Sequence, residues 1–138
     1  MTRNRLALVL LALAPAAASA QPPAKPKTDI SKQIIGIWEG PYQSDQSPPG
    51  GLKLTVARGA DGAWQATLEI FSDEAPPAGD VRDFKVEADT VSWAQTVAEF
   101  ECLSKATLVA GSLKGVAECW QSGALALTAG FLLEKKKP

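Results

Sequence analysis

The sequence predicts an all-β protein, a single antiparallel up-and-down barrel of about eight short strands that follows one helical turn. Hydrophobic and polar residues alternate along most of the chain, which is the period of a half-buried strand. The connections between these runs are short and rich in Gly, Asp and Ser, as hairpin turns are, and none of them resembles a crossover helix. A sandwich would suit the same pattern, but a barrel leaves no exposed strand edges, so we favour the barrel.

The first twenty residues have the features of a secretory signal peptide. Arg3 and Arg5 open the segment, an apolar run extends from Leu6 to Ala14, and Ala18-Ser19-Ala20 supplies a small-residue cleavage site. The alternative is a membrane anchor, but a spanning helix needs roughly 20 apolar residues and this run is about half as long. We therefore expect cleavage near Ala20 and a periplasmic or secreted protein without a membrane span.

The chain that remains is acidic and contains no histidine. Residues 1–20 hold two of the 14 basic residues, so 12 basic side chains face 15 acidic ones after cleavage. Without histidine, a Ser-His triad, a histidine-ligated zinc site and the usual acid-base group near neutral pH are excluded. We expect no catalytic residue, no metal and no cofactor, and therefore no enzyme. The negative net charge also argues against nucleic acid as a partner.

Three regions are expected after the signal peptide. Residues 21–28 are rich in Pro and Lys and should form a flexible linker. Residues 29–134 should form the barrel domain, and residues 135–138 a basic tail.

The barrel domain opens with a turn and a strand. Thr28 or Asp29 can cap one helical turn that extends to Gln33. The first strand is expected from Ile34 to Tyr42. The long segment from Pro41 to Gly51 that follows is expected to form a lid.

A hairpin comes next, with Gly59-Ala60-Asp61-Gly62 as a strong turn signal between two alternating runs. The residues that share its inward face are Leu52, Leu54, Val56, Trp64, Ala66, Leu68 and Ile70.

A second hairpin turns near Ala88-Asp89. Its inward pairs should be Val86 with Val91, Phe84 with Trp93 and, one step further, Arg82 with Gln95.

The two cysteines provide a test of this reasoning. A hairpin that turns at Ala110-Gly111 places Cys102 directly opposite Cys119, and the same register puts charged residues on one face and apolar residues on the other. In an exported protein such a pair forms a disulfide. The alternatives are two free thiols or a metal site, but a structural zinc needs four ligands.

The last strand is expected from Ala124 to Thr128, after a three-residue connection at Gln121-Ser122-Gly123. This connection would place Leu125 against Cys119 and Leu127 against Ala117.

Gly36-Ile37-Trp38, which opens the first strand after a helical turn, resembles the Gly-x-Trp signature of the lipocalins and the wider calycin group. The resemblance extends over residues 29–134 and implies a small lipocalin-like barrel of the kind found among exported bacterial proteins. These proteins have no activity in common. The resemblance also implies that Trp38 closes the barrel floor and that a basic residue of the last strand packs over it. The basic residues near that strand are Lys135 to Lys137, with no arginine among them.

The start at Gly36 and the Asp61-Gly62 turn are also similar to avidin-type barrels. However, the chain after the signal peptide contains no asparagine and only one tyrosine, Tyr42, whereas the biotin pocket of that family depends on several such groups. We therefore do not expect biotin binding.

Two readings of the barrel interior remain open. Small residues such as Ser104 and Ala117 can receive the large aromatic residues and leave a solid core. Alternatively, a pocket holds a small apolar or amphipathic ligand, with an inward Arg82 selecting an anionic or polar end. The ligand-binding residues of this second reading are Tyr42, Arg82, Phe84, Trp93, Gln95 and Phe100.

A different class of function uses the outer surface. Trp120 has the opposite parity to Cys119 and should lie outside near Glu101, where it can contact an exported protein partner or a target enzyme. The acidic residues around Pro76-Pro77 are a weaker candidate for calcium or acid-base chemistry, and solvation is their ordinary role. They are Asp73, Glu74, Asp80 and Asp83.

Overall fold

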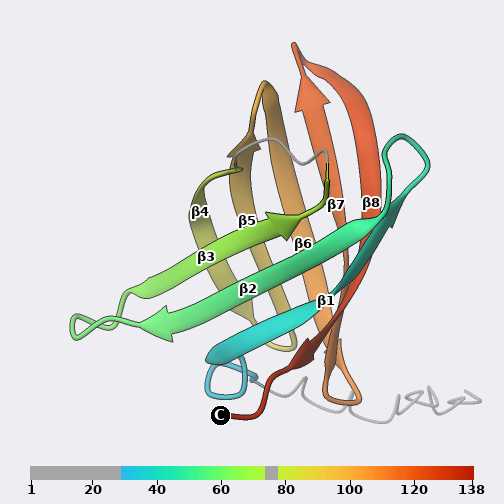
Figure 1. Ribbon diagram of the computed structural model, residues 1–138. Helices are drawn as coiled ribbons and strands as arrows, with labels where there is room; N and C mark the ends of the chain where they lie inside the picture. Colours follow the sequence, from blue (N-terminus) through green and yellow to red (C-terminus); the bar gives the residue numbers. More distant parts are fainter. Residues whose placement is uncertain (1–28, 74–77) are drawn as a thin grey trace, which may run out of the picture.

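The computed structural model describes residues 29–73 and 78–138, so the expected signal peptide and linker lie outside the described residues. Within them the chain forms eight strands joined by short turns, with no helix (Figure 1). The strands are β1 (Gly36–Ser44), β2 (Gly50–Arg58), β3 (Trp64–Phe71), β4 (Ala78–Glu87), β5 (Thr90–Val97), β6 (Phe100–Val109), β7 (Ser112–Gln121) and β8 (Ala124–Lys135).

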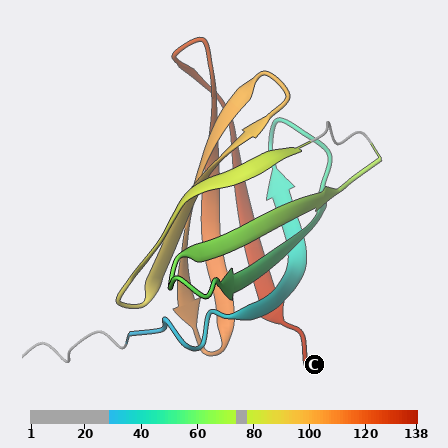
Figure 2. The ribbon, with the colours of Figure 1, turned by 90° about the vertical axis from the view of Figure 1, so that its left-hand side faces the viewer.

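The strands form one antiparallel sheet with the order β3-β2-β1-β8-β7-β6-β5-β4. Because β1 pairs with both β2 and β8, the first and last strands lie side by side. The sheet curls into a nearly closed barrel, which Figures 1 and 2 show from two directions. The predicted up-and-down barrel is confirmed, although in the described part of the chain no backbone ladder joins β3 to β4.

Side chains bridge this seam between β3 and β4. Gln95 of β5 donates its side-chain N–H groups to the carbonyl of Gly79 in β4, at 2.7 Å, and to that of Leu68 in β3, at 3.4 Å. The ring centroids of Trp64 in β3 and Phe84 in β4 lie 5.6 Å apart. These contacts hold the two edge strands together where backbone hydrogen bonds do not.

Trp38 closes one end of the barrel and is only 2% exposed. Its Nε1 donates to the carbonyl of Ile34 at 2.8 Å, and the N–H of Ile34 bonds to the carbonyl of Ile30 at 2.9 Å. This last bond closes the predicted single helical turn. Lys135 covers the indole with its Nζ 5.7 Å from the ring centroid, and it donates to the carbonyl of Gln33 at 2.8 Å.

Gly36 makes room for this lysine. Its φ is +138°, and a Cβ at this position would lie 2.8 Å from Cε of Lys135. Gly36 and Trp38 therefore both contribute to the floor, as the lipocalin resemblance implies, with a lysine as the basic residue over the ring. Lys135 is the last residue of β8.

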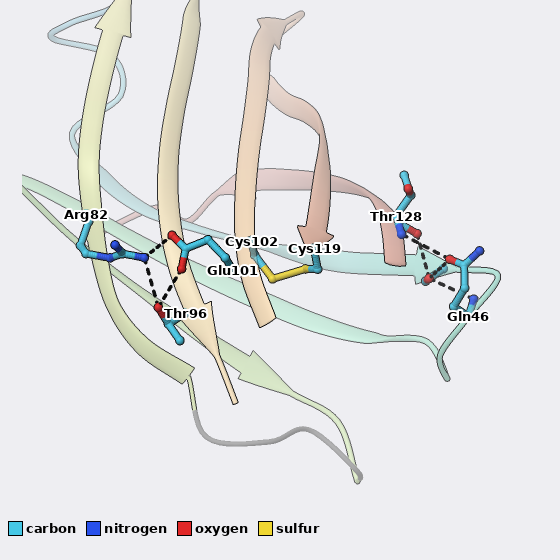
Figure 3. The surroundings of a disulfide bond; sticks show 8 residues. Gln46, Arg82, Thr96, Glu101, Cys102, Cys119 and Thr128 are labelled. Carbon is cyan, nitrogen blue, oxygen red and sulfur yellow. Dashed lines mark hydrogen bonds and ion pairs between the residues drawn. A yellow bond between two sulfur atoms is a disulfide. The ribbon is translucent and has the colours of Figure 1, made fainter. Parts of the chain in front are cut away.

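Most hairpin registers agree with the prediction. Val86 pairs with Val91, as predicted. Leu54 and Leu68, which were predicted to share the inward face, pair with each other. Cys102 lies directly opposite Cys119, and the two form a disulfide whose Cα atoms are 4.0 Å apart (Figure 3). The clean sorting of polar and apolar residues was thus a reliable guide to register.

Arg82 departs from the prediction. A bulge between Arg82 and Lys85 adds one residue to β4, and Asp83 within it has a φ of 54°. Because one extra residue reverses the side-chain parity, Val81 pairs with Gln95 and Arg82 points outward. The predicted inward arginine is therefore wrong.

The connection between β7 and β8 is also shorter than predicted. Ser122 and Gly123 both have positive φ, as a two-residue type I′ turn requires. Leu125 consequently pairs with Trp120 and is 50% exposed, instead of facing Cys119. A bulge then returns Leu127 to the inward side, opposite Cys119.

The expected long lid after the first strand is mostly strand. β1 continues to Ser44 and β2 starts at Gly50, with Tyr42 paired to Gly50. Only residues 45–49 form a loop.

Candidate functional site

A cavity of about 390 Å³ lies at the end of the barrel opposite Trp38. It opens beside the loop between β1 and β2. Its lining consists of Tyr42, Gln46, Ser47, Pro48, Leu52, Leu68, Ile70, Ser72, Gln95, Val97, Phe100, Cys102, Ser104, Ala117, Cys119, Leu127, Ala129 and Phe131.

The cavity ends where Phe131 fills the barrel. Gly115 and Ala106 lie side by side on β7 and β6, and a Cβ on Gly115 would lie 2.5 Å from Cζ of Phe131. The absence of a side chain at Gly115 therefore admits the phenyl ring. Phe131 also lies 5.9 Å from Trp93 between ring centroids. Between Phe131 and the floor at Trp38, the barrel interior is packed with side chains.

On the cavity side of Phe131, three small residues form a row across β6, β7 and β8. Ser104 pairs with Ala117, and Ala117 pairs with Ala129. All three line the cavity. The barrel interior is thus packed in its lower half, at the Trp38 end, and hollow in its upper half, beside the 45–49 loop. Each of the two predicted interiors, a solid core and a pocket, therefore describes one end of the barrel.

The cavity wall carries no charged side chain within the described residues. Its two most buried polar residues are Gln95, 2% exposed, and Ser104, 6% exposed. The wall is otherwise largely apolar, with the disulfide forming part of it. A chamber of this kind suits an uncharged ligand, because nothing in it would compensate a buried charge.

The loop at the mouth is tied to β8. The hydroxyl of Ser44 donates to the carbonyl of Thr128 at 2.8 Å, and Oε1 of Gln46 accepts from the backbone N–H of Thr128 at 3.3 Å (Figure 3). The backbone N–H of Gln46 in turn bonds to the hydroxyl of Ser44 at 3.1 Å. These bonds hold the 45–49 loop at the rim of the cavity.

Of the six residues predicted to bind a ligand, Tyr42, Gln95 and Phe100 line the cavity. Phe84 and Trp93 instead stack below it, 6.2 Å apart between centroids, as part of the packed half. Arg82 lies outside the barrel. Sequence reasoning noted Ser104 and Ala117 as small residues but did not assign them to a site. It placed Leu127 inward, against Ala117 instead of Cys119, but assigned neither Leu127 nor Ala129 to the site.

Arg82 joins a network on the outer surface (Figure 3). Its guanidinium donates to the carboxylate of Glu101, and to the hydroxyl of Thr96 at 3.1 Å. The Thr96 hydroxyl donates to Glu101 at 3.0 Å. The bond from Arg82 and then that from Thr96 hold the pKa of Glu101 below its usual value.

This network predicts a pH-dependent contribution to stability. Because the pKa of Glu101 is lower in the folded state, its stabilising effect is complete above the unfolded pKa of about 4.3 and is lost as pH falls through the folded value. Glu101→Gln should therefore differ from wild type in urea midpoint at pH 7 and approach it near pH 3. Glu118→Gln on the same outer face is the control, and an equal difference at both pH values would contradict the prediction.

Trp120 lies opposite Glu101, as predicted, and is partly exposed. Its Nε1 is buried without a hydrogen-bond partner among the described residues, as is that of Trp93. A second, wider hollow of about 710 Å³ lies outside β4 to β7 and is lined by charged residues such as Lys85, Lys105 and Glu118. It is more open to solvent than the inner cavity.

The acidic residues near Pro76-Pro77 do not assemble a metal site within residues 29–73 and 78–138, where no three His, Cys, Asp or Glu side chains are grouped to hold an ion. Glu74 lies outside the described residues. In the same part of the chain, no helix has the length and apolar character needed to cross a membrane.

Neither a scan against protein-family models nor a search of curated proteins finds a match for this chain. The fold is compatible with a lipocalin-like barrel, and the class that the structure defines is an eight-stranded antiparallel barrel with a cavity that enters the barrel interior.

Proposed function

We propose that this protein is an exported binding protein that holds a small, uncharged, apolar or amphipathic molecule in the upper half of its barrel. The observation that carries the proposal is the 390 Å³ cavity with a mostly apolar wall and two buried polar residues. Binding pockets for small molecules typically have volumes of about 300–1,000 Å³ and combine an apolar lining with a few polar groups.

The cavity volume limits the size of the ligand. At the roughly 30 Å³ that a water molecule occupies in the liquid, the cavity has room for about a dozen waters, or a ligand of roughly ten to twenty non-hydrogen atoms. The outward position of Arg82 removes the reason to expect an anionic ligand. Export is supported by the signal-like N-terminus and by the Cys102–Cys119 disulfide, which belongs to an oxidising compartment.

Binding of N-phenyl-1-naphthylamine, a neutral fluorescent probe, tests the proposal. We expect its emission to rise and shift to the blue in the presence of the folded protein, with saturation at one equivalent. A bound ligand should also raise the melting temperature in a concentration-dependent manner. Absence of both effects would remove the support for ligand binding.

Ala117→Leu should block the cavity. Ala117 is the middle residue of the small row, so a leucine there projects into the space that the probe would occupy. We expect at least a tenfold weaker affinity for the probe, measured by fluorescence titration. Ala126→Leu is the matched control, since Ala126 is an exposed residue of β8 outside the cavity lining. If both variants bind like wild type, the probe is not in the barrel.

A further inference from the structure

We infer that the ligand of this cavity carries an uncharged hydrogen-bond donor, a hydroxyl or an amide N–H, which Gln95 and Ser104 recognise. The inference rests on the proposed function and specifies the chemical class of its ligand.

Gln95 presents an acceptor to the cavity. Both of its side-chain N–H groups are used at the seam, on the carbonyls of Gly79 and Leu68. The side chain is 98% buried, and its Oε1 has no hydrogen-bond partner among the described residues. A glutamine side chain with its donors used offers only its carbonyl oxygen, which takes a donor from a ligand.

Ser104 lies on the neighbouring strand of the same wall. It is 94% buried and lines the cavity, and its hydroxyl makes no hydrogen bond to any described residue. Gln95 pairs with Cys102, so Ser104 is its diagonal neighbour on the inward face, about 7–8 Å away between Cα atoms. The two polar groups therefore form one recognition patch on the cavity wall, and neither oxygen is among the fully buried atoms without a partner, which in the described residues are Nε1 of Trp93 and Nε1 of Trp120.

Charge complementarity restricts the ligand further. A carboxylate would meet the carbonyl oxygen of Gln95 and find no cation in the cavity wall, and an ammonium group would find no anion. Burial of either ion without a partner is costly. An ether or ester oxygen accepts hydrogen bonds but cannot satisfy Oε1 of Gln95. A neutral donor with an apolar body meets all of these conditions, because the rest of the wall includes Phe100, Leu127 and Ile70.

Three probes of equal chain length test the inference by isothermal titration calorimetry at pH 7: nonan-1-ol, its isomer 1-methoxyoctane, and nonanoate. We expect nonan-1-ol to bind roughly three- to tenfold more tightly than the ether, as one net hydrogen bond provides, and to exceed nonanoate by more than tenfold. Ser104→Ala should weaken the affinity for nonan-1-ol at least about twofold, because the Ser104 hydroxyl no longer bonds to the oxygen of the alcohol. Ser92→Ala, a serine of β5 outside the cavity lining, should leave this affinity unchanged.

The outcomes separate the two proposals. If N-phenyl-1-naphthylamine binds but the alcohol, the ether and the carboxylate do not differ, the inference is overturned and the binding function stands. An affinity for nonan-1-ol that is unchanged in Ser104→Ala also overturns it, since Ser104 would then have no part in recognition. If no probe binds at all, both the function and the inference fall. Gln95 is left unchanged in these experiments, because its substitution would also open the seam.

Discussion

Replacement of Trp38 by alanine is expected to lower the free energy of unfolding by about 3–5 kcal/mol, the range for a buried tryptophan truncated in a packed core. Trp38 is 2% exposed, receives Lys135 over one face and bonds through Nε1 to the carbonyl of Ile34. Its loss leaves a cavity at the floor and frees the turn that starts at Ile30. Since small domains have about 5–15 kcal/mol in total, the variant should be close to unfolding at 37 °C.

Urea denaturation followed by circular dichroism measures this effect. Trp120→Ala is the matched control, because Trp120 is a partly exposed residue of the outer face, and we expect it to cost about 1 kcal/mol, near the average of point substitutions. Equal losses for the two variants would mean that the floor contributes no more to stability than an outer residue. Lys135→Ala should have an intermediate effect, since it removes the cover of the ring but not the ring.

The sequence was informative wherever polarity alternated without interruption. Leu54, Leu68 and the cysteines were placed correctly because a shift by one residue would have exposed a whole apolar face, which strongly disfavours every other register. The Gly36 and Trp38 positions were equally clear, since a local motif defined them.

Two irregularities of single residues account for the errors. The bulge at Asp83 turned Arg82 outward, and the two-residue turn at Ser122-Gly123 moved Leu125 outward. Both depend on positive φ at a non-glycine residue, for which the side chain carries only a weak signal. Arg82, which was expected to point inward and select an anionic or polar end of a ligand, therefore forms a surface ion pair with Glu101 instead.

The cavity itself was beyond sequence reasoning for a different reason. Its volume is the difference between the space that the barrel encloses and the side chains that fill it, so it depends on where each ring points. Phe131 bends into the gap left by Gly115 and thereby closes the lower half, while the row at Ser104 and Ala117 stays open. Pattern analysis gives the facing residues of each strand but not these ring positions.

Removal of the disulfide is the second change with a large expected effect. The free energy of unfolding of the double variant Cys102→Ala and Cys119→Ala should be about 3 kcal/mol lower than that of wild type. This is the chain-entropy estimate for a loop with a sequence separation of 17. Titration of the denatured wild-type protein should find no reactive thiol, and two reactive thiols would contradict the bridge itself.

The disulfide lies in the hollow half of the barrel, and this position predicts which part of the barrel loses local stability when the disulfide is removed. The floor is held by the packing of Trp38 and Leu113, whereas the wall at Cys102 and Cys119 has the cavity on its inner side and lacks such packing. Without the bridge, native-state hydrogen exchange should accelerate most in the cavity ends of β6 and β7 and least around Trp38. The affinity for N-phenyl-1-naphthylamine should fall as well. If the cavity wall opens locally, only the molecules whose wall is closed can bind the probe, and the apparent affinity falls with their fraction. An even loss of protection over both ends would instead show that the bridge stabilises the barrel as a single unit, and that the cavity wall is rigid without it.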